Sequence, residues 1–304
     1  MRKLFLGNEA VARGLYEAGC RVASSYPGTP STEVTESAAK YDEIYCEWAP
    51  NEKVAMETAG GAAIAGARSF CGMKHVGLNP LFTLSYTGVN AGMVIVVADD
   101  PGMHSSQNEQ DSRNYAKASK IPMLEPADSQ ECLSFTKLAY DISERYDTPV
   151  IIRLTTRISH SRSLVEVGER VDNGLKEYVK DTQKYVMMPA MAKKKHVIVE
   201  ERTKALTAWG ESEAIDLGVN KIEYNDKKIG IITGGIAYQY GTGNGCAQGN
   251  LHGDLFIGRP FAIDPGGVVF DQVLQYFSGG CAGIAEGSAD TALPCAARNC
   301  LVAR

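Results

Sequence analysis

The chain has 304 residues, of which 44% are hydrophobic and 22% charged, and its formal net charge is −5. This composition is typical of a water-soluble globular protein, and the acidic balance argues against a surface for nucleic acid or anionic membranes. No apolar run approaches the ~20 residues of a membrane span, and the amino-terminal residues do not resemble a signal peptide. We therefore expect a cytoplasmic protein.

The eight cysteines divide into two groups. Cys20, Cys46, Cys71 and Cys132 lie in apolar surroundings, which favours free, buried thiols. The other four fall within the last 64 residues, without the CxxC spacing of a zinc site or an iron–sulfur cluster. We predict no metal ligands in this chain.

Hydrophobic spacing predicts alternating helices and strands through residue 154. The predicted helices are 4–19, 31–40, one from Asn51 onward, 81–89 and 128–145; the predicted strands are 21–26, 43–48, 69–76, 93–98, 122–124 and 149–154. This alternation predicts an α/β fold, a parallel sheet covered by helices on both faces. The loops after the strands then form the expected ligand-binding edge. Those loops contain Pro27–Thr29, Trp48–Glu52, Asn79 and Asp99–Arg113.

The helix that follows Pro50 is unusual because it is built almost entirely from small residues. Asn51 is a strong N-cap, Glu52 begins the first turn, and the Gly60-Gly61 pair weakens helicity by ~1 kcal/mol per glycine relative to alanine. Such a helix forms only if it is buried and something packs close to it. By periodicity alone, it is a core helix whose Glu52 complements the helix dipole.

Two loops also have simple structural explanations. Tyr26–Ser31 contains a sharp Pro27-Gly28 turn, and Ser31 or Thr29 could cap the following helix. Asp99–Arg113 is polar throughout and could be a solvated loop. Its terminal arginine could instead bind a carboxylate in a bidentate pair.

Three segments together resemble one family, the alpha subunit of indolepyruvate:ferredoxin oxidoreductases. They are Tyr26–Glu33 (YPGTPSTE), Glu47–Gly66 (EWAPNEKVAMETAGGAAIAG) and Asp99–Arg113 (DDPGMHSSQNEQDSR), and the resemblance extends to about residue 240. It implies that residues 1–162 form a thiamine-diphosphate pyrimidine-binding domain and residues 163–226 an interdomain connector. Residues 227–304 would be the truncated start of a transketolase-C-terminal-like domain, opened by a strand at Ile229–Ile232.

The resemblance also implies roles for individual residues. Glu52 would activate thiamine diphosphate through N1′ of its pyrimidine ring, in an apolar setting that lets the carboxyl group share a proton. Thr29 and Arg113 would bind the carboxylate of a 2-oxo acid, and Pro27 and Asn79 would contact the cofactor. Family members carry a longer loop between Asn79 and Pro80 than this chain does.

The activity implied is the oxidative decarboxylation of aryl-pyruvates to aryl-acetyl-CoA with ferredoxin as electron acceptor. A beta subunit and a second alpha chain would be partners. The diphosphate and its Mg²⁺ would bind a domain missing here, and the family's iron–sulfur ligands are absent. Two alternatives stay open: a subunit acting on a different 2-oxo acid, and a catalytically silent truncated fragment.

The sequence changes character after Tyr240. The last 64 residues contain 12 of the 31 glycines, no lysine and a single glutamate, Glu286. A divergent, loop-rich domain could have this composition, but a shifted reading frame explains it better because surface helices need charged residues. The strand at Ile229–Ile232 would then have few partners.

Overall fold

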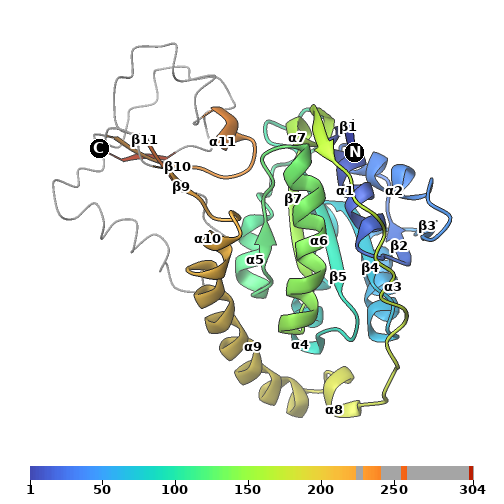
Figure 1. The fold of residues 1–304 in the computed structure, drawn as a ribbon. Helices are drawn as coiled ribbons and strands as arrows, with labels where there is room; N and C mark the ends of the chain where they lie inside the picture. The colour runs from blue at the N-terminus through green and yellow to red at the C-terminus, as the bar shows by residue number, and fades with distance from the viewer. Residues whose placement is uncertain (224–228, 241–254, 259–300, 304) are drawn as a thin grey trace.

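The computed structural model describes residues 1–223, 229–240, 255–258 and 301–303 (Figure 1). The main body of these residues contains a six-stranded parallel sheet with the strand order β3-β2-β4-β5-β7-β6. The strands are β2 (Val22–Ser25), β3 (Tyr45–Trp48), β4 (Ser69–Lys74), β5 (Met93–Asp99), β6 (Met123–Leu124) and β7 (Val150–Thr155). The predicted parallel sheet is confirmed. The last strand of this sheet along the chain is β7, but the strand at the edge of the sheet is β6.

Helices cover both faces of this sheet, as the sequence predicted. They are α1 (Gly7–Glu17), α2 (Thr32–Ala38), α3 (Glu52–Ile64), α4 (Leu81–Thr87), α5 (Arg113–Ser119), α6 (Ser129–Tyr146) and α7 (Thr156–His160), with a 3-10 turn η1 (His75–Gly77). Along the central strand β5, Val94 and Val96 pack with α1, α2 and α6. Ile95 and Val97 pack with α3, α4 and α5 on the opposite face. Both faces are buried, so the strand has no polar alternation.

The first element differs from the prediction. Residues 4–19 were expected to form one helix, but β1 (Arg2–Leu6) precedes α1. β1 pairs antiparallel with β8 (Arg162–Glu166), with Leu4 opposite Leu164. A strand partner 160 residues away leaves no local signal in the sequence. The pairing also joins residues 163–166, which were expected to lie in a connector, to the main body.

The segment after β8 contains a long helix that the sequence analysis did not predict. α9 (Pro189–Gly210) lies between the short helices α8 (Thr182–Tyr185) and α10 (Glu213–Asp216) and runs past the end of α4 (Figure 1). Leu206 and Trp209 are its apolar anchors in the main core. Val199 is also buried, but the polar Arg202 and Thr203 share this buried face and interrupt its apolar stripe. In the Lys193–Lys195 run, the first two lysines are exposed.

The carboxyl-terminal strands form a second sheet with the order β12-β10-β11-β9. It comprises β9 (Ile222–Glu223), β10 (Ile229–Ile232), β11 (Leu255–Gly258) and β12 (Leu301–Ala303), and a short helix α11 (Ala237–Gln239) follows β10. The predicted strand at β10 is confirmed. The expectation that it has few partners is wrong, because β11 pairs with it in parallel and β12 antiparallel. Apart from β11 and β12, the glycine- and cysteine-rich tail and its reading frame lie outside the described residues.

The four cysteines of the main body are free thiols, as predicted. Burial raises the pKa of the Cys20 thiol to about 12 and that of the half-buried Cys46 to about 11. They are therefore protonated and unreactive at neutral pH. The tail cysteines lie outside the described part of the chain.

Candidate active site

The predicted motifs meet at one edge of the sheet. Because the six strands are parallel, their carboxyl ends lie on the same side, and each motif follows such an end. Pro27–Thr29 follows β2, Glu52 follows β3, Asn79 follows β4 through η1, and Asp99–Arg113 follows β5. The edge predicted from the sequence is therefore present.

Glu52 is the first residue of α3 and is only half-buried. The Asn51 side chain caps the helix, its Oδ1 accepting a hydrogen bond from the Val54 N–H at 3.0 Å. No described residue donates a hydrogen bond to the Glu52 carboxylate or forms an ion pair with it. The carboxylate at this helix start is therefore free to accept a hydrogen bond from a ligand.

The small residues of α3 and η1 permit very close packing around Glu52. A Cβ atom added to Gly77 would lie 2.0 Å from the Glu52 Cβ and 3.1 Å from the Met73 Sδ. On the next turns of α3, a Cβ at Gly60 would lie 3.0 Å from Leu84 of α4. The prediction that α3 is buried against a close neighbour is confirmed along this face, where Ala55 is fully buried.

The Pro27–Thr29 turn is held by its own hydrogen bonds and leaves Thr29 exposed. The Ser31 N–H and hydroxyl both donate to the Gly28 carbonyl at 2.8 Å, and the Gly28 N–H donates to Thr32 Oγ1 at 2.9 Å. Ser31 is the residue before α2, but its side chain makes no capping hydrogen bond. The Thr29 hydroxyl has no hydrogen-bond partner among the described residues, and Pro27 is likewise exposed. Both are accessible to a ligand.

The loop after β5 is ordered by a buried carboxylate. Asp100 accepts hydrogen bonds from the Ser105 N–H at 2.8 Å, the Ser106 hydroxyl at 2.7 Å and the Thr156 hydroxyl at 3.0 Å. Burial by itself would raise the pKa of the Asp100 carboxyl, but these bonds, together with the charge of Lys74, lower it to about 2. The loop is therefore folded against the sheet edge and is not simply a solvated connection.

Arg113 lies at the start of α5 and is already paired within the chain. Its Nε and Nη2 donate to Oε1 and Oε2 of Glu125 at 2.6 and 3.2 Å, and its Nη1 lies 3.5 Å from Asp111. The Arg113–Glu125 ion pair lies on the β5-β7-β6 side of the sheet edge, whereas Glu52 lies on the β3-β2-β4 side. The 3-10 turn η1 lies between them. The arginine predicted to bind a substrate carboxylate thus lies at the predicted edge, where an internal carboxylate holds it.

Sequence reasoning missed the charged cluster around Arg153. This arginine is 5% exposed, and its Nε donates to Asp99 Oδ2 at 2.6 Å while its Nη1 donates to Glu125 Oε2 at 3.3 Å. The signal was available, because Arg153 interrupts the apolar strand VIIRLT and a buried arginine needs carboxylate partners. Burial would raise the pKa of the Glu125 carboxyl, but Arg153 and Arg113 hold it below its ordinary value.

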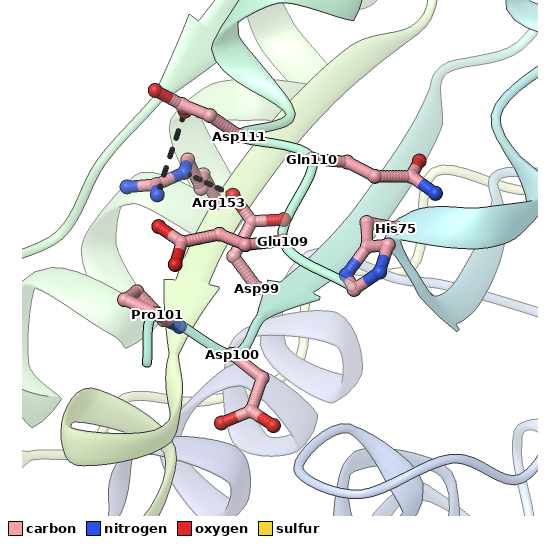
Figure 2. A pocket seen from close by; sticks show the side chains of 8 residues that line it. All are labelled: His75, Asp99, Asp100, Pro101, Glu109, Gln110, Asp111 and Arg153. Atoms are coloured by element: carbon pink, nitrogen blue, oxygen red, sulfur yellow. Dashed lines mark hydrogen bonds and ion pairs between the residues drawn. The ribbon is translucent and has the colours of Figure 1, made fainter. Parts of the chain in front are cut away.

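A small pocket, partly open to solvent and with room for about one water molecule, lies over this cluster (Figure 2). Its lining residues are His75, Asp99, Asp100, Pro101, Glu109, Gln110, Asp111 and Arg153. The His75 Nε2 is 3.2 Å from Asn108 Oδ1, so η1 contacts the Asp99–Arg113 loop. Within the described residues, no cluster of histidine, cysteine, aspartate or glutamate is arranged to hold a metal ion.

Comparison with known proteins identifies the family. Residues 13–223 match the family described as pyruvate flavodoxin/ferredoxin oxidoreductase, thiamine diphosphate-binding. The chain belongs to this family. The match begins within α1, includes the whole of the sheet edge described above, and ends with β9, before β10.

Individual curated relatives show which members of the family are similar to this chain. The chain is 45% identical over 247 residues to indolepyruvate oxidoreductase subunit IorA of Methanothermobacter thermautotrophicus, an alignment that covers 78% of this chain and 40% of the relative. It is 44% identical to the same subunit of Pyrococcus abyssi, over 79% of this chain and 38% of that protein. A more distant relative, 2-oxoglutarate synthase subunit KorA of M. thermautotrophicus, is 30% identical over 54% of this chain and 47% of its own length. The chain therefore spans about 40% of the length of the indolepyruvate relatives.

The fold is also found among solved structures. A 2-oxoglutarate:ferredoxin oxidoreductase from Magnetococcus marinus superposes with a TM-score of 0.71 at 18% identity, covering 90% of this chain and 56% of that one. In the parts of this chain that the structure describes, no helix combines the length and apolar character of a membrane-spanning segment.

Proposed function

We propose that this chain forms the thiamine-diphosphate pyrimidine-binding part of an indolepyruvate:ferredoxin oxidoreductase alpha subunit. The observation that carries the proposal is the unpartnered Glu52 carboxylate at the start of α3, within the matched family domain. The complete enzyme converts an aryl-pyruvate and CoA to aryl-acetyl-CoA and passes the electrons to ferredoxin. A beta subunit and a second alpha chain complete it, in the cytoplasm.

The residues of this chain fit the pyrimidine end of the cofactor. Bound thiamine diphosphate supplies an electron sink for the decarboxylation of 2-oxo acids. Glu52 presents a carboxylate with no internal partner, and Gly77 brings η1 within contact of its side chain. Pro27 and Asn79 are exposed at the same edge and contact the cofactor. The diphosphate and its Mg²⁺ are held by another domain.

Glu52 would supply the hydrogen bond that the pyrimidine ring needs. Its carboxyl group would share a proton with N1′, the contact through which the 4′-amino group of bound cofactor acquires its basic character. Bound cofactor would exclude water from the half-buried Glu52 carboxylate, and exclusion of water strengthens such a hydrogen bond. Removing one positioned proton-transfer group typically lowers a rate by ~10²–10⁴.

Thr29 and Arg113 bind the carboxylate of the substrate. The exposed Thr29 hydroxyl lies in a turn fixed by its own hydrogen bonds, and Arg113 supplies a charged, planar donor group. Residues 1–162 carry these groups, residues 163–226 connect, and residues 227–304 begin the next domain. The last of these segments brings the turn after β10 close to this edge, because a Cβ at Gly234 would lie 3.3 Å from the Glu125 carboxylate.

A second candidate function is oxidation of a different 2-oxo acid. The similarity to 2-oxoglutarate synthase subunit KorA favours this alternative, because it extends over 178 residues of alignment, 54% of this chain, at 30% identity. Affinity for phenylpyruvate compared with 2-oxoglutarate distinguishes the two. The indolepyruvate assignment predicts that the aryl acid binds more tightly.

Titration of thiamine diphosphate and Mg²⁺ into this chain, with and without a supplied diphosphate-binding domain, tests the proposal. Binding is measured by calorimetry, and exchange of the cofactor's C2 proton by NMR. Glu52→Gln should slow that exchange by ~10²–10⁴ while the protein stays folded. Glu57→Gln is the matched control, since Glu57 is an exposed carboxylate on the same helix.

Three results would contradict the proposal. Exchange at the wild-type rate in Glu52→Gln removes the proton-holding role. Equal effects of the Glu52 and Glu57 substitutions would show that helix charge alone matters. Absence of cofactor binding in either format favours the catalytically silent fragment.

A further inference from the structure

Two internal carboxylates contact the N–H donors of the Arg113 guanidinium. Glu125 occupies the edge formed by Nε and Nη2 in a bidentate pair, and Asp111 lies 3.5 Å from Nη1. An arginine also binds the carboxylate of a substrate through this bidentate geometry. If Arg113 binds substrate, as the proposed function requires, then Glu125 and the substrate compete for it.

Arg153 makes the exchange of partners possible. The Glu125 side chain is 11% exposed, so a Glu125 carboxylate without any cation beside it would be a buried, uncompensated charge. Arg153 prevents this, because its Nη1 donates to Glu125 Oε2 at 3.3 Å and it is itself held by Asp99 at 2.6 Å. Glu125 therefore keeps a partner when Arg113 leaves.

Arg113 is the partner that can move. Its side chain is 31% exposed, whereas that of Arg153 is 4% exposed. The turn after β10 also lies close to Glu125, since a Cβ at Gly234 would be 3.3 Å from Glu125 Oε2. Glu125 is thus confined, and the more exposed Arg113 at the start of α5 can turn to a ligand.

We infer that Glu125 is a positioning residue that acts as an internal competitor for Arg113. It keeps the guanidinium aligned at the site entrance, and binding of a 2-oxo acid replaces the Glu125 carboxylate with that of the substrate. The apparent affinity for substrate is then lowered by the fraction of Arg113 that is engaged with Glu125. This inference rests on the proposed function.

Phenylpyruvate binding to the full 304-residue chain tests the inference. Glu125→Gln keeps an amide oxygen as acceptor but removes the charge, so phenylpyruvate should bind on the order of tenfold more tightly. Arg113→Ala should weaken binding by about tenfold, and Glu125→Gln should have no effect in that background. Asp111→Asn is the matched control and should change the affinity far less, because the Asp111 carboxylate meets the Arg113 guanidinium only at Nη1, at 3.5 Å. Its other contact with Arg113 is to the backbone N–H, at 3.4 Å.

A second readout uses the wild-type protein and does not depend on the folding of a variant. Saturation with phenylpyruvate should shift the NMR resonance of the Arg113 Nε–H and leave that of Arg153 in place. The inference is overturned if that resonance is unmoved, or if Glu125→Gln binds phenylpyruvate equally or more weakly while Arg113→Ala still weakens binding. If Arg113→Ala binds like the wild type, or no variant binds at all, the substrate role of Arg113 in the proposed function is wrong, and the inference with it.

Discussion

At the residue scale, two glycines in the elements around Glu52, one in η1 and one in α3, differ in how closely other atoms approach them. Gly77 of η1 lies so near Glu52 that a Cβ there would be 2.0 Å from the Glu52 Cβ. Gly61 of α3 has no atom within 4 Å of the position its Cβ would occupy. The glycine at 77 is therefore required by a close approach, and the one at 61 is not.

Alanine substitutions should separate these two glycines. Gly77→Ala forces η1 and Glu52 apart and should destabilise the fold by about 1–3 kcal/mol, with weaker cofactor binding. Gly61→Ala should stabilise the exposed helix position by about 0.4–1 kcal/mol. Denaturant unfolding and calorimetric titration measure both effects. Equal stabilities of the two variants would show that η1 moves aside without penalty.

At the element scale, one buried arginine, Arg202, adds a polar clamp to the apolar anchors of α9. The Nη2 of Arg202 donates to the carbonyl and hydroxyl oxygens of Ser85 at 2.8 and 2.9 Å, and its Nη1 donates to the Asp147 carbonyl at 3.0 Å. Burial lowers the pKa of the Arg202 guanidinium to about 10, against the opposing charge of Asp147. The clamp therefore joins α9 to the ends of both α4 and α6.

Removing the donors of this clamp should loosen α9. Arg202→Met keeps much of the side-chain length but leaves the Ser85 and Asp147 carbonyls without their donors, at a loss of about 2–4 kcal/mol in the free energy of unfolding. Lys204→Met is the control, since Lys204 is exposed on the same helix. Hydrogen exchange should show α9 amides opening faster in the first variant only. Similar exchange in the two variants would mean that Leu206 and Trp209 hold the helix alone.

At the scale of the whole molecule, acid stability depends on carboxylates held by cations. Glu144 of α6 accepts hydrogen bonds from Arg68 at 2.9 and 3.1 Å and from the Gly92 N–H at 3.0 Å, and Lys176 lies 3.1 Å away. Burial would raise the pKa of the Glu144 carboxyl, but these partners lower it from 4.5 to about 2. Segments far apart in sequence are joined at this one side chain.

The sign of the pH dependence follows from that lowered pKa. The contribution of Glu144 is complete above its unfolded pKa and is lost as pH falls through the folded value, so wild-type stability should drop between about pH 4.5 and 2 by roughly 3 kcal/mol. Glu144→Gln should be less stable at pH 7 and show a smaller drop. Asp141→Asn is the control, because Asp141 is 70% exposed and meets Arg68 at 3.4 Å. Parallel unfolding curves for the wild type and Glu144→Gln from pH 7 to 2 would contradict the assignment.

The sequence by itself determined the sheet and the edge that carries the site. Continuous apolar runs such as Met93–Ala98, and local caps such as Asn51 and Asp128, act within a few residues, so periodicity reveals them. The positions of Glu52 and Thr29 after the strand ends follow from that topology.

Only the tertiary structure decided how charge is shared at that edge. Arg153 and Asp99 are 54 residues apart, and whether Arg113 is free or paired with Glu125 depends on which side chains the folded sheet brings within hydrogen-bond distance. The same reason explains β1, whose partner β8 is distant in sequence. It also explains α9, whose buried face includes the polar Arg202 and Thr203 and therefore gives no clear apolar pattern. Long-range contacts leave no local signal, because their energy comes from burial and pairing that exist only once the chain is folded.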